Sequence, residues 1–328
     1  MGCKVLIFRT DRVGDLLVAC PAILTIKNYF IDAEIHLVSS EKNYSYALSL
    51  NIFKNIYKFP SSNILNKIKF IQNLRKKEFD YIFVFDGKSR SIITASLINS
   101  KYKVALVQKI KFIYKFFNIK LFKDSEETSL DQIFQQSLYF CNINAKIENF
   151  NFLSKKKDNN FSSNISIDKY THIHLDEKWF SNIYIKSYTD INPDYDSFIN
   201  FIINLTEKQN ILITTGIIDF NLLDELKKKF FEKKNEKIYV KKYLNNFIYF
   251  IYKPTFEDIE SLLRKSKILI TCHGAILHAA NSFDVKKIDI IEKKKEKFYQ
   301  RFTFYLNDYK RLYRSDFTKL EKDIYKLI

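Results

Sequence analysis

Short apolar runs alternate with segments of helical spacing along most of this chain, which restricts it to few folds. The run Tyr81-Ile82-Phe83-Val84-Phe85 is almost unbroken, which suits a parallel strand covered on both faces. We predict first-half strands at 4–8, 34–38, 55–59, 81–85 and 103–107. Helical spacing is found at 16–30, 44–50, 64–76, 91–97 and 132–141. Such alternation with short connections is typical of a parallel α/β sheet.

The pattern starts again after a polar break at 155–160. We predict second-half strands at 171–175, 210–215, 268–271 and 287–291, and helices at 196–205, 221–231, 256–264, from 275 onward and at 317–328. The stretch 238–252 is too aromatic for an assignment. The sequence therefore predicts an α/β protein with two facing Rossmann-like domains and mostly parallel sheets, at 1–160 and 161–328. The last helix is a candidate for packing back on the first domain.

The chain is basic, with 54 Lys and Arg residues against 37 Asp and Glu and a formal net charge of +17. Only eight of the basic residues are Arg. Abundant Lys, Asn, Ile, Phe and Tyr together are what an AT-rich genome produces, whereas nucleic-acid recognition favours clustered Arg. We therefore expect no nucleic-acid partner. A basic face attracted to an anionic membrane or a phosphorylated glycolipid stays open.

The cysteines and the apolar runs indicate in which cellular compartment the protein works. Cys3, Cys20, Cys141 and Cys272 form no CxxC pair, which fits a reducing cytosol. No run approaches the ~20 apolar residues of a membrane span. We expect a cytoplasmic protein that is a candidate for peripheral contact with the inner face of the cytoplasmic membrane. In 109–122, Lys alternates with Ile, Phe and Tyr; this predicts either a flexible basic segment that touches a lipid-linked acceptor or a helix that buries one face.

The turn Arg9-Thr10-Asp11-Arg12-Val13-Gly14-Asp15 joins the first strand to the first helix. Ligands of α/β sheets gather where strands end and helices begin. Two Arg and two Asp around one Gly are therefore a candidate site. Asp15 is either a functional carboxylate or a cap of the helix from Leu16. We interpret Asp11 as an ion-pair partner of the arginines.

Four of the five glycines follow predicted strands, namely Gly14, Gly87, Gly216 and Gly274. Glycine is tolerated where the backbone turns tightly or approaches a ligand. A simple strand end explains most of this pattern, but not the polar residues that flank Gly14 and Gly274. We expect two sites that face each other across a cleft between the domains.

Several common nucleotide and metal motifs are missing from the sequence. No GxGxxG follows the first strand, and neither GxxxxGK[ST] nor HExxH occurs. These absences argue against dinucleotide dehydrogenases, P-loop proteins and zincin proteases. Two Rossmann-like domains without these motifs favour a glycosyltransferase of GT-B architecture.

Two motifs carry a resemblance to a known family. Residues 9–17 with Pro21 resemble the N-terminal signature of glycosyltransferase family 9, the ADP-heptose:lipopolysaccharide heptosyltransferases. Residues 271–280 resemble that family's Asp-Thr-Gly-x-x-His-x-Ala-Ala turn, although Cys272-His273 replaces Asp-Thr and His278 lies one residue farther along. The resemblance implies an inverting, metal-independent transferase without a cofactor. Its partners would be a nucleotide-sugar donor and a lipid-linked or oligosaccharide acceptor.

The resemblance also implies roles for residues. Asp15 matches the catalytic base, with Arg9, Arg12 and Gly14 supporting the acceptor side. Gly274 and the amides of Ala275 and Ile276 would hold the diphosphate, assisted by Lys178 or Lys186. The other donor-side candidates are Cys272, His273, His278, Gly216, Asp219 and His174.

Alternatives remain for individual residues and for the whole chain. His174 could meet a phosphate or pack in a core, and His273 with His278 is a poor metal pair because i and i+5 do not share a helix face. The chain could instead use another nucleotide sugar, bind nucleotide without catalysis, or bind nucleic acid.

Overall fold

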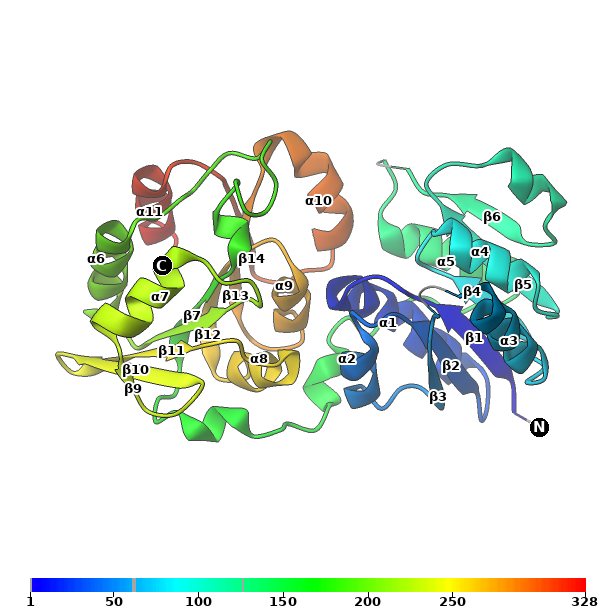
Figure 1. The fold of residues 1–328 in the computed structure, drawn as a ribbon, viewed down its shortest axis with the longest axis horizontal. Coiled ribbons are helices and arrows are strands. Elements are labelled where there is room, and N and C mark those ends of the chain that lie inside the picture. Colours follow the sequence, from blue (N-terminus) through cyan, green and yellow to red (C-terminus); the bar gives the residue numbers. More distant parts are fainter. Residues whose placement is uncertain (1, 61–62, 126) are drawn as a thin grey trace. The chain divides into compact units, whose positions relative to one another are not determined.

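The computed structural model describes residues 2–60, 63–125 and 127–328, which divide into two units. The N-terminal unit runs to Phe152 and includes Gln300–Phe304. The C-terminal unit comprises Leu153–Tyr299 and Tyr305–Ile328. Each unit contains one sheet flanked by helices (Figure 1).

The sheet of the N-terminal unit is parallel throughout its described strands. In spatial order these are β3 (Asn55–Lys58), β2 (Glu34–Ser39), β1 (Lys4–Phe8), β4 (Tyr81–Val84), β5 (Tyr102–Val107) and β6 (Lys120–Lys123). The helices are α1 (Val13–Tyr29), α2 (Tyr44–Ser49), α3 (Ile64–Arg75), α4 (Ser89–Ser96) and α5 (Leu130–Phe140), with a 3-10 turn η1 (Phe112–Phe116). The sequence thus predicted a parallel α/β sheet correctly.

Two helical layers bury the two faces of this sheet, because alternate strand residues point to opposite sides. Leu6 and Phe8 of β1 pack in one cluster with buried residues of α3, α4 and η1. On the other face α1 contacts α5, and Phe134 of α5 packs against Phe85 with ring centroids 4.7 Å apart. We call α3, α4 and η1 together the α3–α4–η1 layer.

The sheet of the C-terminal unit is mostly parallel, with one antiparallel edge. Its spatial order is β14 (Tyr309–Tyr313), β13 (Lys286–Ile291), β12 (Ser266–Cys272), β7 (Tyr170–Leu175), β8 (Ile211–Thr215), β11 (Asn246–Ile251), β10 (Ile238–Tyr243) and β9 (Glu232–Lys233). The α-helices are α6 (Tyr195–Thr206), α7 (Asn221–Glu225), α8 (Phe256–Leu263), α9 (Ala275–Ala280), α10 (Glu296–Thr303) and α11 (Phe317–Tyr325). Shorter helical turns are η2 (Phe152–Lys155), η3 (Phe161–Asn164), η4 (Glu177–Trp179), η5 (Leu226–Phe230, a π turn) and η6 (Lys293–Lys295).

The division between the units lies at Phe152/Leu153, eight residues before the predicted boundary at 160/161. The lysine-rich stretch is not a solvated linker, because the C-terminal unit holds it. The Arg264 guanidinium donates to the carbonyls of Leu153 (3.2 Å) and Lys156 (2.6 Å), and Lys156 Nζ pairs with Glu260 at 2.7 Å.

The last helix also differs from the expectation. Phe317, Leu320 and Ile324 of α11 are buried in the core of the C-terminal unit, so the helix packs on its own unit. The segment that joins the N-terminal unit is instead Gln300–Phe304, at the end of α10. There, Arg301 pairs with Asp124 and donates to the Thr128 carbonyl at 3.0 Å.

Several elements escaped the sequence analysis. The aromatic stretch 238–252 forms the β10–β11 hairpin, and neither β14 nor α10 was predicted. The segment 109–122 forms η1 and the start of β6, not a single helix. Across residues 2–60, 63–125 and 127–328, no helix combines the length and apolar character needed to span a membrane.

Candidate active site

The turn after β1 is organised by the start of α1. This helix begins at Val13, three residues earlier than predicted, so Asp15 lies in its first turn. The Arg12 backbone N–H donates to Asp15 Oδ2 at 3.2 Å, which satisfies one donor that the helix start leaves unpaired. Arg12 itself is exposed, and Gly14 lies within the same first turn. Asp15 therefore has a capping contact, as the alternative interpretation expected.

Arg9 lies behind this carboxylate and is 5% exposed. Its Nε donates to the Asp15 carbonyl at 2.9 Å, and its Nη1 donates to the Phe85 carbonyl. Nη2 lies 3.7 Å from Asp15 Oδ1, and Nη1 lies 3.5 Å from Asp11 Oδ2. Since α1 and the end of β4 both hold the guanidinium, its charge is fixed behind the carboxylates.

The two carboxylates of this turn differ in accessibility. The Asp15 side chain is 37% exposed, whereas that of Asp11 is 18% exposed. Burial raises the pKa of Asp11, as do the neighbouring Asp86 and Asp15 charges, against the opposing effects of Arg9 and Lys88. Asp11 is thus an inner ion-pair partner, as predicted. Asp15 is the carboxylate that solvent or a ligand can reach, and chemically it can accept a proton.

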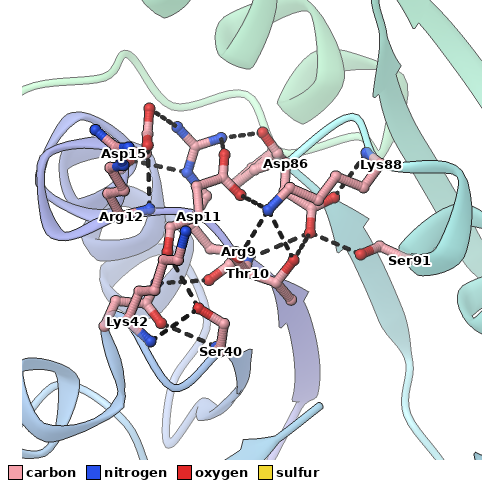
Figure 2. Close-up of polar contacts among 12 residues, drawn as sticks. Arg9, Thr10, Asp11, Arg12, Asp15, Ser40, Lys42, Asp86, Lys88 and Ser91 are labelled. Atoms are coloured by element: carbon pink, nitrogen blue, oxygen red, sulfur yellow. Dashed lines mark hydrogen bonds and ion pairs between the residues drawn. The ribbon is translucent and has the colours of Figure 1, made fainter. Parts of the chain in front are cut away.

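A second turn, between β4 and α4, supplies residues to which the sequence analysis gave no role. Figure 2 shows Asp86 bound both to the turn after β1 and to α4: the Thr10 hydroxyl and the Ser91 hydroxyl each donate to Asp86 Oδ2 at 2.6 Å. Lys88 Nζ lies 3.0 Å from Asp11 Oδ1 and donates to the Thr10 carbonyl at 2.7 Å. The only sequence signal was Asp86-Gly87 directly after an apolar run.

A pocket of about 610 Å³ opens beside these two turns. It is lined by Gly87, Lys88, Ser89, Arg90, Gln108, Lys109, Lys111 and Tyr114. Among these lining residues four are Lys or Arg and none is acidic, so the pocket attracts an anion. Arg90 connects it to the turn, because Nη2 donates to Thr10 Oγ1 at 3.3 Å. Gly87 has φ +63°, a conformation that favours glycine.

In the C-terminal unit, the turn after β12 is built around Gly274. A Cβ at this position would lie 2.9 Å from Lys178 Nζ, so the glycine leaves room for the ammonium group. The lysine whose ammonium group lies at this turn is therefore Lys178, and not the exposed Lys186. The helix α9 begins at Ala275, which places the N–H groups of Ala275 and Ile276 in a first turn that offers no internal acceptor.

Asp176 lies in contact with three of the predicted donor-side residues, Lys178, His174 and Gly216. It is 2% exposed and pairs with Lys178, while His174 Nε2 lies 3.5 Å from its Oδ2. Burial by itself would raise the pKa of Asp176, but Lys178 and His174 outweigh it and lower the pKa. Burial opposes the charge of Lys178 as well, and the Asp176 charge outweighs it and raises the pKa of Lys178. A Cβ at Gly216 would lie 2.8 Å from Asp176 Cβ, so this glycine also belongs to the cluster.

The two histidines of the turn are paired differently. His273 Nδ1 lies 2.9 Å from Oδ2 of the fully buried Asp289, and His278 Nδ1 lies 2.8 Å from the Tyr305 hydroxyl. Burial, followed by the nearby His273, lowers the pKa of His278 to about 3. His278 is therefore neutral near pH 7.

Two further predicted donor-side residues have other polar partners. The Cys272 side chain is buried against Arg314, and burial raises its pKa to about 12, so the thiol is neutral. Asp219 is exposed and accepts from the Tyr252 hydroxyl at 2.6 Å. Within the described ranges, no group of three or more His, Cys, Asp or Glu side chains is placed to hold a metal ion.

The arrangement of the sheets and helices defines the class of fold. Two Rossmann-like units, each with a mostly parallel sheet, are the architecture of the GT-B glycosyltransferases. No protein-family model matches the sequence, and no curated protein matches it. Solved structures do match, over nearly the whole chain.

Among these structures are glycosyltransferases of the family that the motifs resemble. The heptosyltransferase WaaC of E. coli with ADP is 13% identical, with a TM-score of 0.67 and coverage of 99% of this chain and 100% of that chain. A family 9 glycosyl transferase from Veillonella parvula is 12% identical, with a TM-score of 0.66 and coverage of 99% and 90%. At this identity the likeness establishes the fold, and it is the fold that the motif resemblance predicted.

The same architecture also occurs with a different chemistry. A UDP-GlcNAc 2-epimerase from Methanocaldococcus jannaschii is 14% identical, with a TM-score of 0.55 and coverage of 98% of this chain and 92% of that chain. Fold alone therefore does not select the reaction, which has to be argued from the residues.

Proposed function

We propose that the chain is an inverting, metal-independent glycosyltransferase that moves heptose from ADP-heptose to a lipopolysaccharide-core or related glycan acceptor. The observation that carries this proposal is Asp15, an accessible carboxylate held against the buried Arg9 at a helix start, within a motif that resembles family 9. The GT-B fold supports it. The N-terminal unit would bind the acceptor and the C-terminal unit the donor.

The reaction needs a group that takes the acceptor proton. Asp15 takes the proton of the acceptor hydroxyl, and the hydroxyl oxygen attacks the anomeric carbon. The bond from that carbon to the diphosphate oxygen breaks, and the diphosphate leaves with the electron pair. A single displacement inverts the anomeric carbon and needs no covalent intermediate. Arg9 fixes the position of the carboxylate through its bond to the Asp15 carbonyl.

The departing diphosphate needs positive charge or N–H dipoles. Lys178 supplies a charge beside Gly274, and its pairing with Asp176 keeps it protonated. The N–H groups of Ala275 and Ile276 point the same kind of partial charge at a bound anion. We assign these groups to the diphosphate, with His273 as the residue that replaces the family's threonine.

The basic pocket supports an acceptor that carries negative charge. Lys88 and Arg90 belong both to the pocket and to the contacts of the turn after β1. An acceptor that presents its hydroxyl to Asp15 would thus place a neighbouring group in this pocket. Four cationic side chains favour a phosphate or carboxylate there.

A ligand screen followed by a transfer assay tests the proposal. We expect ADP-heptose to raise the melting temperature more than GDP-, UDP- or CMP-sugars, because a ligand of the native state stabilises it. We then expect heptose on a lipopolysaccharide-core acceptor and release of ADP, both detected by mass spectrometry.

The alternatives give other results in the same experiment. If another nucleotide sugar raises the melting temperature and its sugar is transferred, that sugar is the donor in place of heptose. Binding without turnover would favour a non-catalytic nucleotide-binding protein, and epimerisation of a UDP-sugar without transfer would contradict transferase activity.

A further inference from the structure

The segments that form the α3–α4–η1 layer are unusual in their charge. Segments 63–77 and 87–123, which contain this layer together with β5 and β6, hold 14 of the 54 basic residues and none of the 37 acidic ones. They account for +14 of the formal charge of +17, while the rest of the chain is nearly balanced. An AT-rich composition would raise lysine content everywhere, so it does not explain this concentration.

The same segments expose large apolar side chains. The inner side of the layer is buried against the sheet through residues such as Leu74, Ile92 and Tyr114. Exposed in the same segments are Ile64, Leu65, Ile68, Ile93, Leu97, Ile110, Phe112, Ile113 and Phe116. We call these residues together with the lysines of the same segments the basic-apolar face. Large apolar side chains exposed together on neighbouring elements favour an interaction surface.

The most exposed aromatic residues are held on an anchored turn. Phe112 is 71% and Phe116 is 74% exposed, and their rings pack edge to face at 5.5 Å. Between them, the Tyr114 ring is buried and its hydroxyl donates to Ser89 Oγ at 2.9 Å. Lys115 Nζ lies 5.4 Å from the Phe112 ring centroid. The turn η1 therefore presents two phenylalanines with a cation beside them.

We propose that the basic-apolar face docks on an anionic phospholipid bilayer. Phe112, Ile113 and Phe116 enter the interfacial region, and the lysines around them pair with lipid phosphates. Lipid fits better than nucleic acid because 12 of the 14 basic residues are Lys and the face is rich in Ile and Phe, which have no partner on a phosphate backbone. This inference does not depend on the proposed reaction.

Vesicle co-sedimentation of the full chain tests the proposal. The probes are phosphatidylcholine vesicles and vesicles of equal parts phosphatidylcholine and phosphatidylglycerol. We expect binding only to the anionic vesicles, weakened by added salt. The double variant Phe112→Ser, Phe116→Ser should bind roughly tenfold or more weakly, because two apolar side chains no longer enter the interface.

A matched control is Leu244→Ser, which removes a side chain that is 66% exposed on the C-terminal unit. It should bind like the parent chain, and melting temperatures of all variants should agree because the changed residues are exposed. Binding to neutral and anionic vesicles alike, no binding at all, or full binding by the double variant would overturn the proposal. So would tighter binding to duplex DNA than to the anionic vesicles. No nucleotide sugar is present, so the vesicle result is independent of transfer activity.

Discussion

The turn after β1 and the turn after β7, whose Lys178 lies against Gly274, use the same kind of charge pair in opposite orientations. In the N-terminal unit the buried member is a cation, Arg9, and the accessible member is the Asp15 carboxylate. In the C-terminal unit the buried member is the Asp176 carboxylate, and the more accessible member is the Lys178 ammonium. The first turn therefore presents a proton acceptor and the second a positive charge. These are the two functions that transfer from a nucleotide sugar needs.

The largest effect is expected from Arg9→Met. This change leaves Asp11 and Asp15 without the guanidinium that both contact, and it leaves the Phe85 carbonyl without its donor. Breaking a buried pair costs about 3 to 5 kcal/mol of unfolding free energy, and we expect the transfer rate to fall with it. Urea denaturation measures the stability. An unchanged midpoint would show that the buried guanidinium does not hold the turn.

The corresponding change in the other turn is Lys178→Met, which tests the positive charge directly. We expect kcat/KM for transfer to fall by about 10² or more, because a fixed charge beside a departing anion is typically worth that much. The exposed Lys186→Met is the matched control and should keep full activity. Equal losses of kcat/KM in the two variants would contradict the assignment of Lys178 to the donor site.

Asp176→Asn tests whether Asp176 holds Lys178 in place. Because the carboxylate is buried beside Lys178, its loss should cost about 2 to 4 kcal/mol of unfolding free energy. Asp219→Asn removes an exposed carboxylate that is also paired with a lysine, and should change stability by less than about 1 kcal/mol. Chemical denaturation of the two variants in parallel measures the difference. Similar values would contradict the buried pair.

A smaller effect is expected from pH, through His278. Its pKa is lowered to about 3 in the folded chain, whereas an unfolded histidine takes up a proton near pH 6.5. Between pH 6.5 and 3 the unfolded state therefore binds more protons than the folded state. The stability that the folded chain has with a neutral His278 is lost as pH falls from about 6.5 towards 3. His278→Gln should flatten the dependence of the unfolding free energy on pH there. An unchanged slope would show that other groups dominate.

The sequence was informative where the evidence was local. Apolar periodicity located β1, β4, β7 and β12 within one or two residues, because each is a buried strand with a short, continuous signal. The edge strand β14 was missed because the adjacent Lys310 and Arg311 interrupt its apolar pattern and the strand is only partly buried. The hairpin of β10 and β11 was missed because both strands mix aromatic residues with aliphatic and polar ones, so neither shows a clean alternation.

The candidate site shows the same limit. Arg9, Asp15 and Gly274 stood out because each lies in a short motif. Asp86 contacts Thr10 across 76 positions of sequence, and Asp289 contacts His273 across 16, so neither partner could be assigned without the sheet registers. The choice between Lys178 and Lys186 as the lysine beside Gly274 likewise required the fold.

The central claim is that Asp15 is the base, and Asp15→Asn tests it most directly. The matched control is Asp32→Asn, the same change at an exposed position in the N-terminal unit. We predict that Asp15→Asn lowers kcat for heptose transfer by about 10² to 10⁴ while the donor still raises the melting temperature normally. The control should transfer at the parent rate. Parent-level transfer by Asp15→Asn would contradict the account.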